Sequence, residues 1–189
     1  MNRPGDDQDD HALVRRALSG EQQSYAALMA RHREAVFRVA RHHTGDEAEA
    51  LDLTQEAFVA AFAALTRFDP ARPFRAWILR ITINKCRDWA RRRAVRRMLR
   101  FALPLEDARD VADAGPDPEA AAISAREVAR ISAAVAALPA NLKTPLILCR
   151  LEGMSMAEAA QVLGISEKAV ETRIYRARQK LSEDFMRKA

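Results

Sequence analysis

The chain is poor in the residues on which several common protein classes depend. Two cysteines among 189 residues, Cys86 and Cys149, cannot form a disulfide framework, and neither has a second cysteine at the spacing of a metal site. Six glycines and 6% aromatic residues argue against a strand-rich sandwich or a glycine-rich nucleotide fold. No uncharged apolar run approaches the roughly 18–20 residues that span a bilayer, and the first ten residues are too acidic for a signal peptide. We therefore expect a reduced, cytoplasmic, helical protein without a membrane segment.

Charge is unevenly distributed along this basic chain, which carries a formal net charge of +5. Residues 72–100 contain eleven Arg or Lys and one acid, whereas residues 101–121 contain six acids and one arginine. The acidic stretch also has three prolines, one glycine and little apolar content, which is the composition of a linker. The charge change therefore divides the chain into two parts.

Apolar residues recur at helical spacing on both sides of this linker. We expect an all-α protein of two small helical domains joined by a flexible acidic linker, with a helix-turn-helix in the C-terminal domain. The expected divisions are a disordered acidic tail over 1–9, a first domain over 10–99, the linker over 100–124 and a second domain over 125–185.

The most informative local pattern is two short helices joined by a glycine turn. Ser155 and Glu158 have the spacing of a capping box, Ser166 can cap the next helix, and Gly164 can take the left-handed conformation between them. This is the pattern of a helix-turn-helix that reads duplex DNA. The exposed face of its second helix would carry polar and basic residues: Lys168, Glu171, Thr172, Tyr175, Arg176, Gln179 and Lys180. The alternative is an amphipathic helical hairpin with a solvated basic face.

Two further groups of charged residues precede the linker. The dense basic run at residues 91–97 favours nucleic acid over a merely solvated face, and Asn84 and Trp89 close by could hold an unstacked base. Trp77 is better explained as a core residue, whereas Trp89 fits either interpretation equally well. An uncompensated acidic run over 46–56 would meet a basic protein partner, or else form an ordinary solvated half-helix.

Enzyme chemistry has little support. The sequence has no Walker loop, G-x-S-x-G or H-E-x-x-H motif. The adjacent His42 and His43 would point about 100° apart on a helix, so a shared metal is not expected. We expect no catalytic residue, no metal and no cofactor.

Three segments in this order resemble a bacterial RNA polymerase sigma factor of the compact extracytoplasmic-function type. They are DLTQEAF at 52–58, FRAWILRITINKCRDWARRR at 74–93, and the helix-turn-helix segment at 148–181. The resemblance covers nearly the whole chain. It implies that residues 10–99 are sigma region two and residues 125–185 are region four.

The resemblance also implies a role for each group of residues. Region two would bind core RNA polymerase and then recognise and melt the minus-ten element, whereas region four would read the minus-thirty-five element in duplex DNA. The implied core polymerase contacts are Asp52, Gln55 and Glu56, the minus-ten contacts are Phe68, Ile81, Asn84, Arg91 and Arg92, and the minus-thirty-five contacts are Lys168, Glu171, Thr172, Tyr175 and Arg176. Many relatives have a basic residue in place of Glu171, and an acid could instead accept a hydrogen bond from cytosine N4.

The expected partners are core RNA polymerase, promoter DNA as duplex and as melted non-template strand, and an anti-sigma factor. Two alternatives remain open from the sequence. One is a two-domain helix-turn-helix regulator that acts without polymerase core, and the other is a sigma mimic that titrates an anti-sigma protein.

Overall fold

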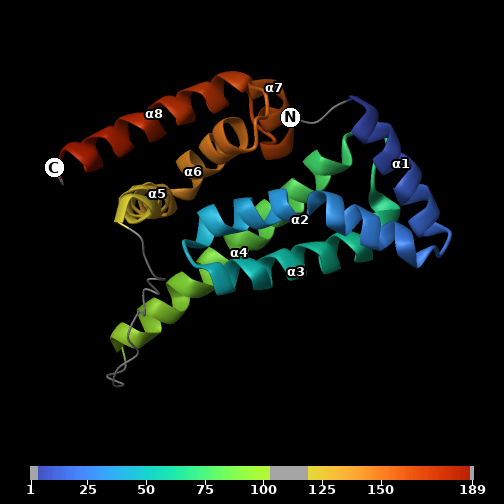
Figure 1. Ribbon diagram of the computed structural model, residues 1–189, viewed down its shortest axis with the longest axis horizontal. Coiled ribbons are helices and arrows are strands. Elements are labelled where there is room, and N and C mark those ends of the chain that lie inside the picture. The colour runs from blue at the N-terminus through green and yellow to red at the C-terminus, as the bar shows by residue number, and fades with distance from the viewer. Residues whose placement is uncertain (1–3, 103–118, 188–189) are drawn as a thin grey trace.

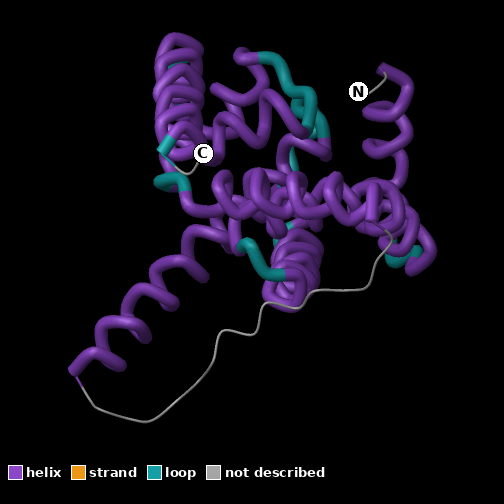
Figure 2. Tube along the Cα trace, turned by 60° about the vertical axis from the view of Figure 1, so that its left-hand side comes forward, coloured by secondary structure: helices purple, strands orange, loops and turns teal. Residues whose placement is uncertain are grey.

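The computed structural model describes residues 4–102 and 119–187, and these residues form helices and no strand (Figures 1 and 2). The elements before the linker are α1 (Pro4–Leu18), α2 (Gln22–Thr44), α3 (Glu47–Ala63), the 3₁₀ turn η1 (Leu65–Arg67) and α4 (Phe74–Ala102). Those after it are α5 (Glu119–Ala137), α6 (Ala140–Leu146), the π-helical turn η2 (Ile147–Leu151), α7 (Met156–Leu163) and α8 (Glu167–Met186). The expected all-α class is confirmed.

Local sequence signals set several helix ends. Gly45 ends α2 in the left-handed conformation with φ of 74°, and the Asp46 side chain then accepts a hydrogen bond from the Glu49 N–H at 2.9 Å to begin α3. Ser155 and Glu158 form the expected capping box at the start of α7. These short-range bonds satisfy backbone groups that would otherwise be unpaired at the helix ends.

The helices before the linker form a bundle built around α2, which packs against α1, α3 and α4. Its centre contains large, fully buried side chains, among them Phe58 of α3, Phe74 of α4 and Leu28 of α2. Burying each such side chain contributes about 1.5–3 kcal/mol relative to leaving it exposed. The bundle therefore holds α3 and α4 side by side with their charged faces outward.

The expected disordered tail over residues 1–9 is wrong from Pro4 onward, because α1 begins there. Proline suits the first turn of a helix, and the helix is anchored further along by Asp10. The Asp10 carboxylate is fully buried, accepts a hydrogen bond from Arg31 Nη1 at 2.6 Å and lies 2.7 Å from His32 Nε2. A composition that favours disorder is thus overridden by tertiary contacts to α2.

The linker is shorter than its composition suggested. Helix α4 continues to Ala102 and α5 already begins at Glu119, so both enter the range of 100–124 that we assigned to the linker. The rest of that range, residues 103–118, lies outside the described residues, as does the flexibility expected there.

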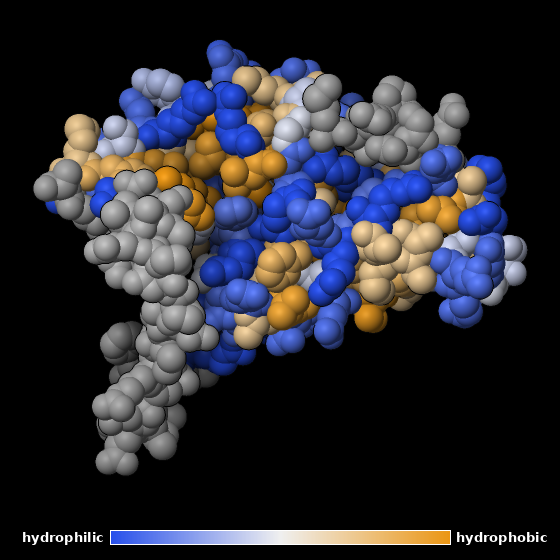
Figure 3. Space-filling view, viewed as in Figure 1, coloured by the Kyte–Doolittle hydropathy of each residue, from blue (hydrophilic) through white to orange (hydrophobic). Residues whose placement is uncertain are grey.

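The helices after the linker pack directly on this bundle. Helix α2 contacts α5, α6 and η2, while α4 contacts α7, and one continuous apolar cluster runs through both sets of helices. A second, smaller cluster around Leu53 and Trp89 lies within the α2–α4 bundle. Figure 1 shows α5 to α8 lying along one side of the α2–α4 bundle. The face shown in Figure 3 mixes hydrophilic residues with smaller apolar patches. A pocket between α5 and α8 is lined by Arg130, Ala133, Ala134, Ala137, Asp184 and Phe185. None of the helices within 4–102 and 119–187 is long and apolar enough to cross a membrane.

Candidate nucleic-acid and polymerase interfaces

Helix α8 presents the residues expected to read duplex DNA on one outward face. Val170, Ile174 and Ala177 are buried and hold α8 against α6 and α7. On the opposite side lie the five predicted residues: Lys168, Glu171, Thr172, Tyr175 and Arg176. The last four follow Lys168 by three, four, seven and eight positions, so all five lie on one face of the helix. All are exposed except Thr172, which is half-buried. The structure therefore brings this group together on one surface.

Contacts within this face determine which polar groups it presents. Lys168 Nζ lies 2.8 Å from Glu171 Oε2, so the unexpected acid is paired with a neighbouring cation. The hydroxyl of Thr172 donates to the Lys168 carbonyl, which leaves its methyl group and oxygen lone pairs for a partner. The phenol of Tyr175 is 61% exposed and accepts a hydrogen bond from Gln179 Nε2 at 3.0 Å. Gln179 thus orients the largest exposed aromatic ring of this surface.

The turn between α7 and α8 sets the angle at which α8 is presented. Gly164 has φ of 65°, a left-handed conformation that residues with a Cβ adopt at a cost. Its N–H bonds to the Ala160 carbonyl, and Ser166 then caps α8 by accepting from the Ala169 N–H at 3.2 Å. The predicted helix-turn-helix is confirmed.

A second outward face runs along α4. Trp77, Ile81 and Asn84 are separated by four and three residues and therefore lie on one side of the helix. Asn84 is exposed, and its only described side-chain contact is a hydrogen bond from Arg87 Nη1 at 3.4 Å. Ile81 is half-buried. An exposed amide beside apolar surface fits the edge and face of an unstacked base.

Phe68 lies deeper than a base-contacting residue would. It is 9% exposed, and its ring packs edge-on against Phe74 at 5.6 Å and Trp77 at 5.3 Å. Asn84 lies ten residues beyond Phe74 along α4, which is about 15 Å of helix. Phe68 therefore packs beneath Trp77 and supports that end of the α4 face, whereas Asn84 lies at the opposite end of the same face.

The basic end of α4 is exposed, whereas the neighbouring Trp89 is buried. Residues 91–98 are all exposed, including the predicted contacts Arg91 and Arg92. Trp89 is 6% exposed and donates from Nε1 to Glu49 Oε2 at 2.6 Å, while Arg93 lies over its ring at 5.2 Å. Trp89 is therefore a core residue that fixes α4 against α3, which decides between the two interpretations left open by the sequence.

The acidic residues of α3 form a shallow groove next to α4. Asp52, Gln55 and Glu56 line it together with Val59 and Lys85. Val59 is 71% exposed, an apolar side chain in a polar surface, and no charge pattern identified it. The three predicted polymerase contacts are thus brought together, and Val59 adds an apolar centre that sequence reasoning missed.

Glu56 links the α3 groove to the basic helix. Its Oε2 lies 3.5 Å from Lys85 Nζ and 4.0 Å from Arg92 Nη2. Arg91 forms an ion pair with Asp88 one turn earlier on the same helix. Arg91 and Arg92 therefore have acidic neighbours on the protein, which phosphate groups would have to displace.

Buried titratable groups lie away from these surfaces. Burial raises the pKa of the Cys86 thiol to about 12, and burial with help from Lys143 lowers the pKa of His43 to about 3. Burial also lowers the pKa of His42. In the part of the chain that the structure describes, no group of three or more His, Cys, Asp or Glu side chains is arranged to hold a metal ion.

Comparison with known proteins matches two successive segments of the chain to two families. The Sigma-70 region 2 family matches residues 28–111, and the Sigma-70 region 4 family matches residues 129–181. The RNA polymerase sigma factor CnrH of Cupriavidus metallidurans is 44% identical over 92% of both chains, and the ECF RNA polymerase sigma factor SigF of Caulobacter vibrioides is 33% identical over 93% of both. A solved structure of CnrH in complex with the cytosolic domain of CnrY matches 95% of this chain and 99% of that one, with 38% identity and a TM-score of 0.69. The chain belongs to the extracytoplasmic-function family of RNA polymerase sigma factors, and it directs RNA polymerase to promoters.

Proposed function

We propose that three separate surfaces of this sigma factor carry three separate steps of initiation. The α3 groove binds core RNA polymerase, the Trp77–Asn84 face of α4 holds the melted minus-ten strand, and the outward face of α8 reads the minus-thirty-five duplex. The observation that carries this proposal is that all three surfaces are exposed at once and lie on different helices. One molecule can therefore engage polymerase and DNA without competition for a single site.

The α3 groove is suited to a basic protein and not to DNA. Asp52 and Glu56 place two carboxylates around exposed Val59, and the Gln55 amide adds both a donor and an acceptor. An apolar centre with a charged rim is typical of protein–protein interfaces. Phosphates would be repelled by the same carboxylates, so the partner of this groove is a polypeptide with Arg or Lys around an apolar residue.

The α4 face is suited to a single strand. Exposed arginines over residues 91–97 would attract phosphates by counterion release, while Ile81 and Asn84 offer an apolar contact and an amide to a base. The ion pairs to Asp88 and Glu56 hold Arg91 and Arg92 close to this face before DNA binds. Strand binding here would stabilise the open complex by keeping bases unstacked.

The α8 face is suited to the major groove. Arg176 and Lys168 can contact phosphates or guanine, and the paired Glu171 can accept from cytosine N4. The exposed Tyr175 ring adds apolar contact with a thymine methyl group or sugar. Glu171 thus gives this chain a base preference that a basic residue at the same position would not give.

The remaining assignments follow from this role. No bond is made or broken by the chain itself, which acts as a non-enzymatic initiation factor in the cytoplasm. Its working units are region two over 10–99 and region four over 125–185. Because the similar protein CnrH was solved in complex with the cytosolic domain of CnrY, we expect this chain to have an inhibitory protein partner of its own, an anti-sigma factor.

Charge reversal in the α3 groove tests the proposal. Asp52→Arg should weaken binding to purified core polymerase at least tenfold, measured by competition with the unmodified chain for limiting core. Glu183→Arg makes the same charge change at an exposed site on α8, far from α3, and should leave core affinity unchanged. Equal effects of the two variants would show that net charge, and not the groove, governs polymerase binding.

A further inference from the structure

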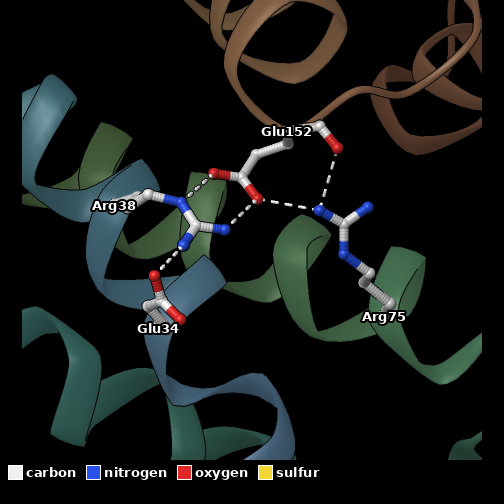
Figure 4. A network of polar contacts seen from close by, with 4 residues as sticks. All are labelled: Glu34, Arg38, Arg75 and Glu152. Atoms are coloured by element: carbon white, nitrogen blue, oxygen red, sulfur yellow. Dashed lines mark hydrogen bonds and ion pairs between the residues drawn. The ribbon is translucent and has the colours of Figure 1, made fainter. Parts of the chain in front are cut away.

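A buried carboxylate of region four is bound by two arginines of region two. The side chain of Glu152, directly after η2, is 0% exposed. Its Oε1 accepts from Arg38 Nε at 2.9 Å and its Oε2 accepts from Arg38 Nη2 at 3.1 Å, so the pair is bidentate. Arg75 Nη2 bonds both Glu152 Oε2 at 2.8 Å and the Glu152 carbonyl at 2.9 Å (Figure 4). One residue of region four is thus held by α2 and α4 together.

The contact continues along α2 to its C-terminal end. Lys143 of α6 is buried and donates from Nζ to the His43 carbonyl at 3.2 Å, and its other described acceptor is the Ala136 carbonyl. A Cβ built on Gly45 would lie 3.2 Å from the Cβ of Ala136, so glycine permits the close approach of α5. The interface between the two regions is therefore built from specific polar contacts as well as apolar packing.

Glu152 gives this interface its specificity. Arg75 is only 15% exposed when docked, so a docked chain without the Glu152 carboxylate would hold a half-buried guanidinium with no anion beside it. Glu34 also pairs with Arg38, but it is 84% exposed and belongs to α2 itself, so it does not cross the interface. Among these acidic partners, only Glu152 links the two regions.

This docked arrangement cannot read both promoter elements at once. Helices α4 and α8 both pack on α7, and packed helices lie about 8–10 Å apart, so α4 and α8 are at most about 20 Å apart where they meet α7. Arg75 lines a pocket with α7, and Asn84 lies nine residues, or about 14 Å, further along α4. The minus-ten and minus-thirty-five elements are about 25 base pairs apart, or about 85 Å at roughly 3.4 Å per pair. Region four must leave region two before both can bind, if the proposed roles of α4 and α8 hold.

We propose that Glu152 is a latch that keeps the chain closed until polymerase and promoter DNA separate its two regions. The latch controls the distance between the two DNA-reading surfaces and does not cover either of them. Arg75 and Asn84 are nine residues apart and hence about 180° apart on α4, so docking leaves the strand-binding face of α4 uncovered. The outward face of α8 is also exposed in the closed form. The closed chain can thus bind either promoter element alone, but it cannot bind the minus-ten and minus-thirty-five elements of one promoter at the same time.

Small-angle X-ray scattering of the full chain tests the latch without polymerase. Glu152→Gln preserves shape and removes the charge, so we expect a larger radius of gyration than for the wild type at the same helical content by circular dichroism. The matched control Glu34→Gln removes a carboxylate from the same Arg38 and should leave scattering unchanged. Scattering curves of wild type and Glu152→Gln that superimpose would overturn the proposal.

A second variant and a second readout keep the test decisive. Arg75→Gln removes the charge from the other side of the interface, and it replaces Glu152→Gln as the deciding variant if the latter loses helical content. Because a closed population lowers the concentration of competent molecules, either variant should also reduce the amount of sigma factor needed for half-maximal transcription by about three- to tenfold. If the wild-type chain supports transcription but Glu152→Gln leaves the scattering curve unchanged, the latch is refuted and the proposed function is not. If Glu152→Gln increases the radius of gyration but the chain never supports transcription, the proposed function is refuted and the latch is not.

Discussion

Acidification should destabilise the protein through His43, a buried imidazole near the end of α2. The residue is 7% exposed, its Nε2 lies 3.4 Å from Thr144 Oγ1, and burial, Lys143 and Arg87 together lower its pKa to about 3. In the unfolded chain the same group should have its ordinary pKa of about 6.5. Between these two values only the unfolded state binds the proton, so stability is lost as pH falls below about 6.5.

The size of the effect follows from the two pKa values. Between about pH 6.5 and pH 3, each unit of acidification costs about 1.4 kcal/mol for one such group. From pH 7 to pH 5 the free energy of unfolding should therefore fall by about 2 kcal/mol through His43 alone. Typical domains have only about 5–15 kcal/mol in total, so the loss should be easy to detect.

Urea unfolding of the wild type and of His43→Gln at pH 7 and pH 5 isolates this contribution. The other titrating groups are present in both proteins and cancel in the difference, apart from the electrostatic interaction of His42 with His43, which is the weakest of the effects on the His43 pKa. The stability advantage of the wild type over the variant should shrink by about 2 kcal/mol at the lower pH. A difference that stays constant with pH would refute the claim that His43 is held neutral by burial.

Three further changes test individual contacts. Asn84→Ala should reduce open-complex formation, measured by 2-aminopurine fluorescence, by about three- to tenfold, because it removes one neutral hydrogen bond to the strand. A comparable loss of affinity for core polymerase would instead show that Asn84 is structural. Trp89→Phe removes the hydrogen bond to Glu49 and should cost about 1 kcal/mol in thermal unfolding, and an unchanged midpoint would contradict the assigned packing role. Ser155→Ala removes half of the capping box and should also cost about 1 kcal/mol, whereas Ser182→Ala, at an exposed position within α8, should leave the midpoint nearly unchanged.

The helices and their caps could be predicted because they depend on neighbouring residues. Ser155, Gly164 and Ser166 act within four positions of the backbone groups they serve, so sequence spacing was sufficient. The helix at Pro4 could not be predicted in this way. It depends on Asp10 reaching His32 and Arg31 on α2, more than twenty residues away, and composition alone suggests a solvated tail.

The same distinction applies to the functional surfaces. Residues that share a helix, such as Asp52 with Glu56 or Lys168 with Arg176, fall on one face because of helical periodicity. Their partners on other helices could not be inferred, as for Glu56 with Lys85 on α4. The burial of Phe68 beneath Trp77 and the pairing of Glu152 with arginines 77 and 114 residues earlier likewise depend on tertiary packing.

Run-off transcription with purified core RNA polymerase tests the central claim most directly. We expect a transcript that requires both this chain and a promoter with its two elements, and that disappears when either element is replaced. A duplex-binding regulator or a sigma mimic would give no such transcript. Binding of the chain to promoter DNA, with no promoter-dependent transcript from core polymerase on a range of genomic promoters, would contradict the account.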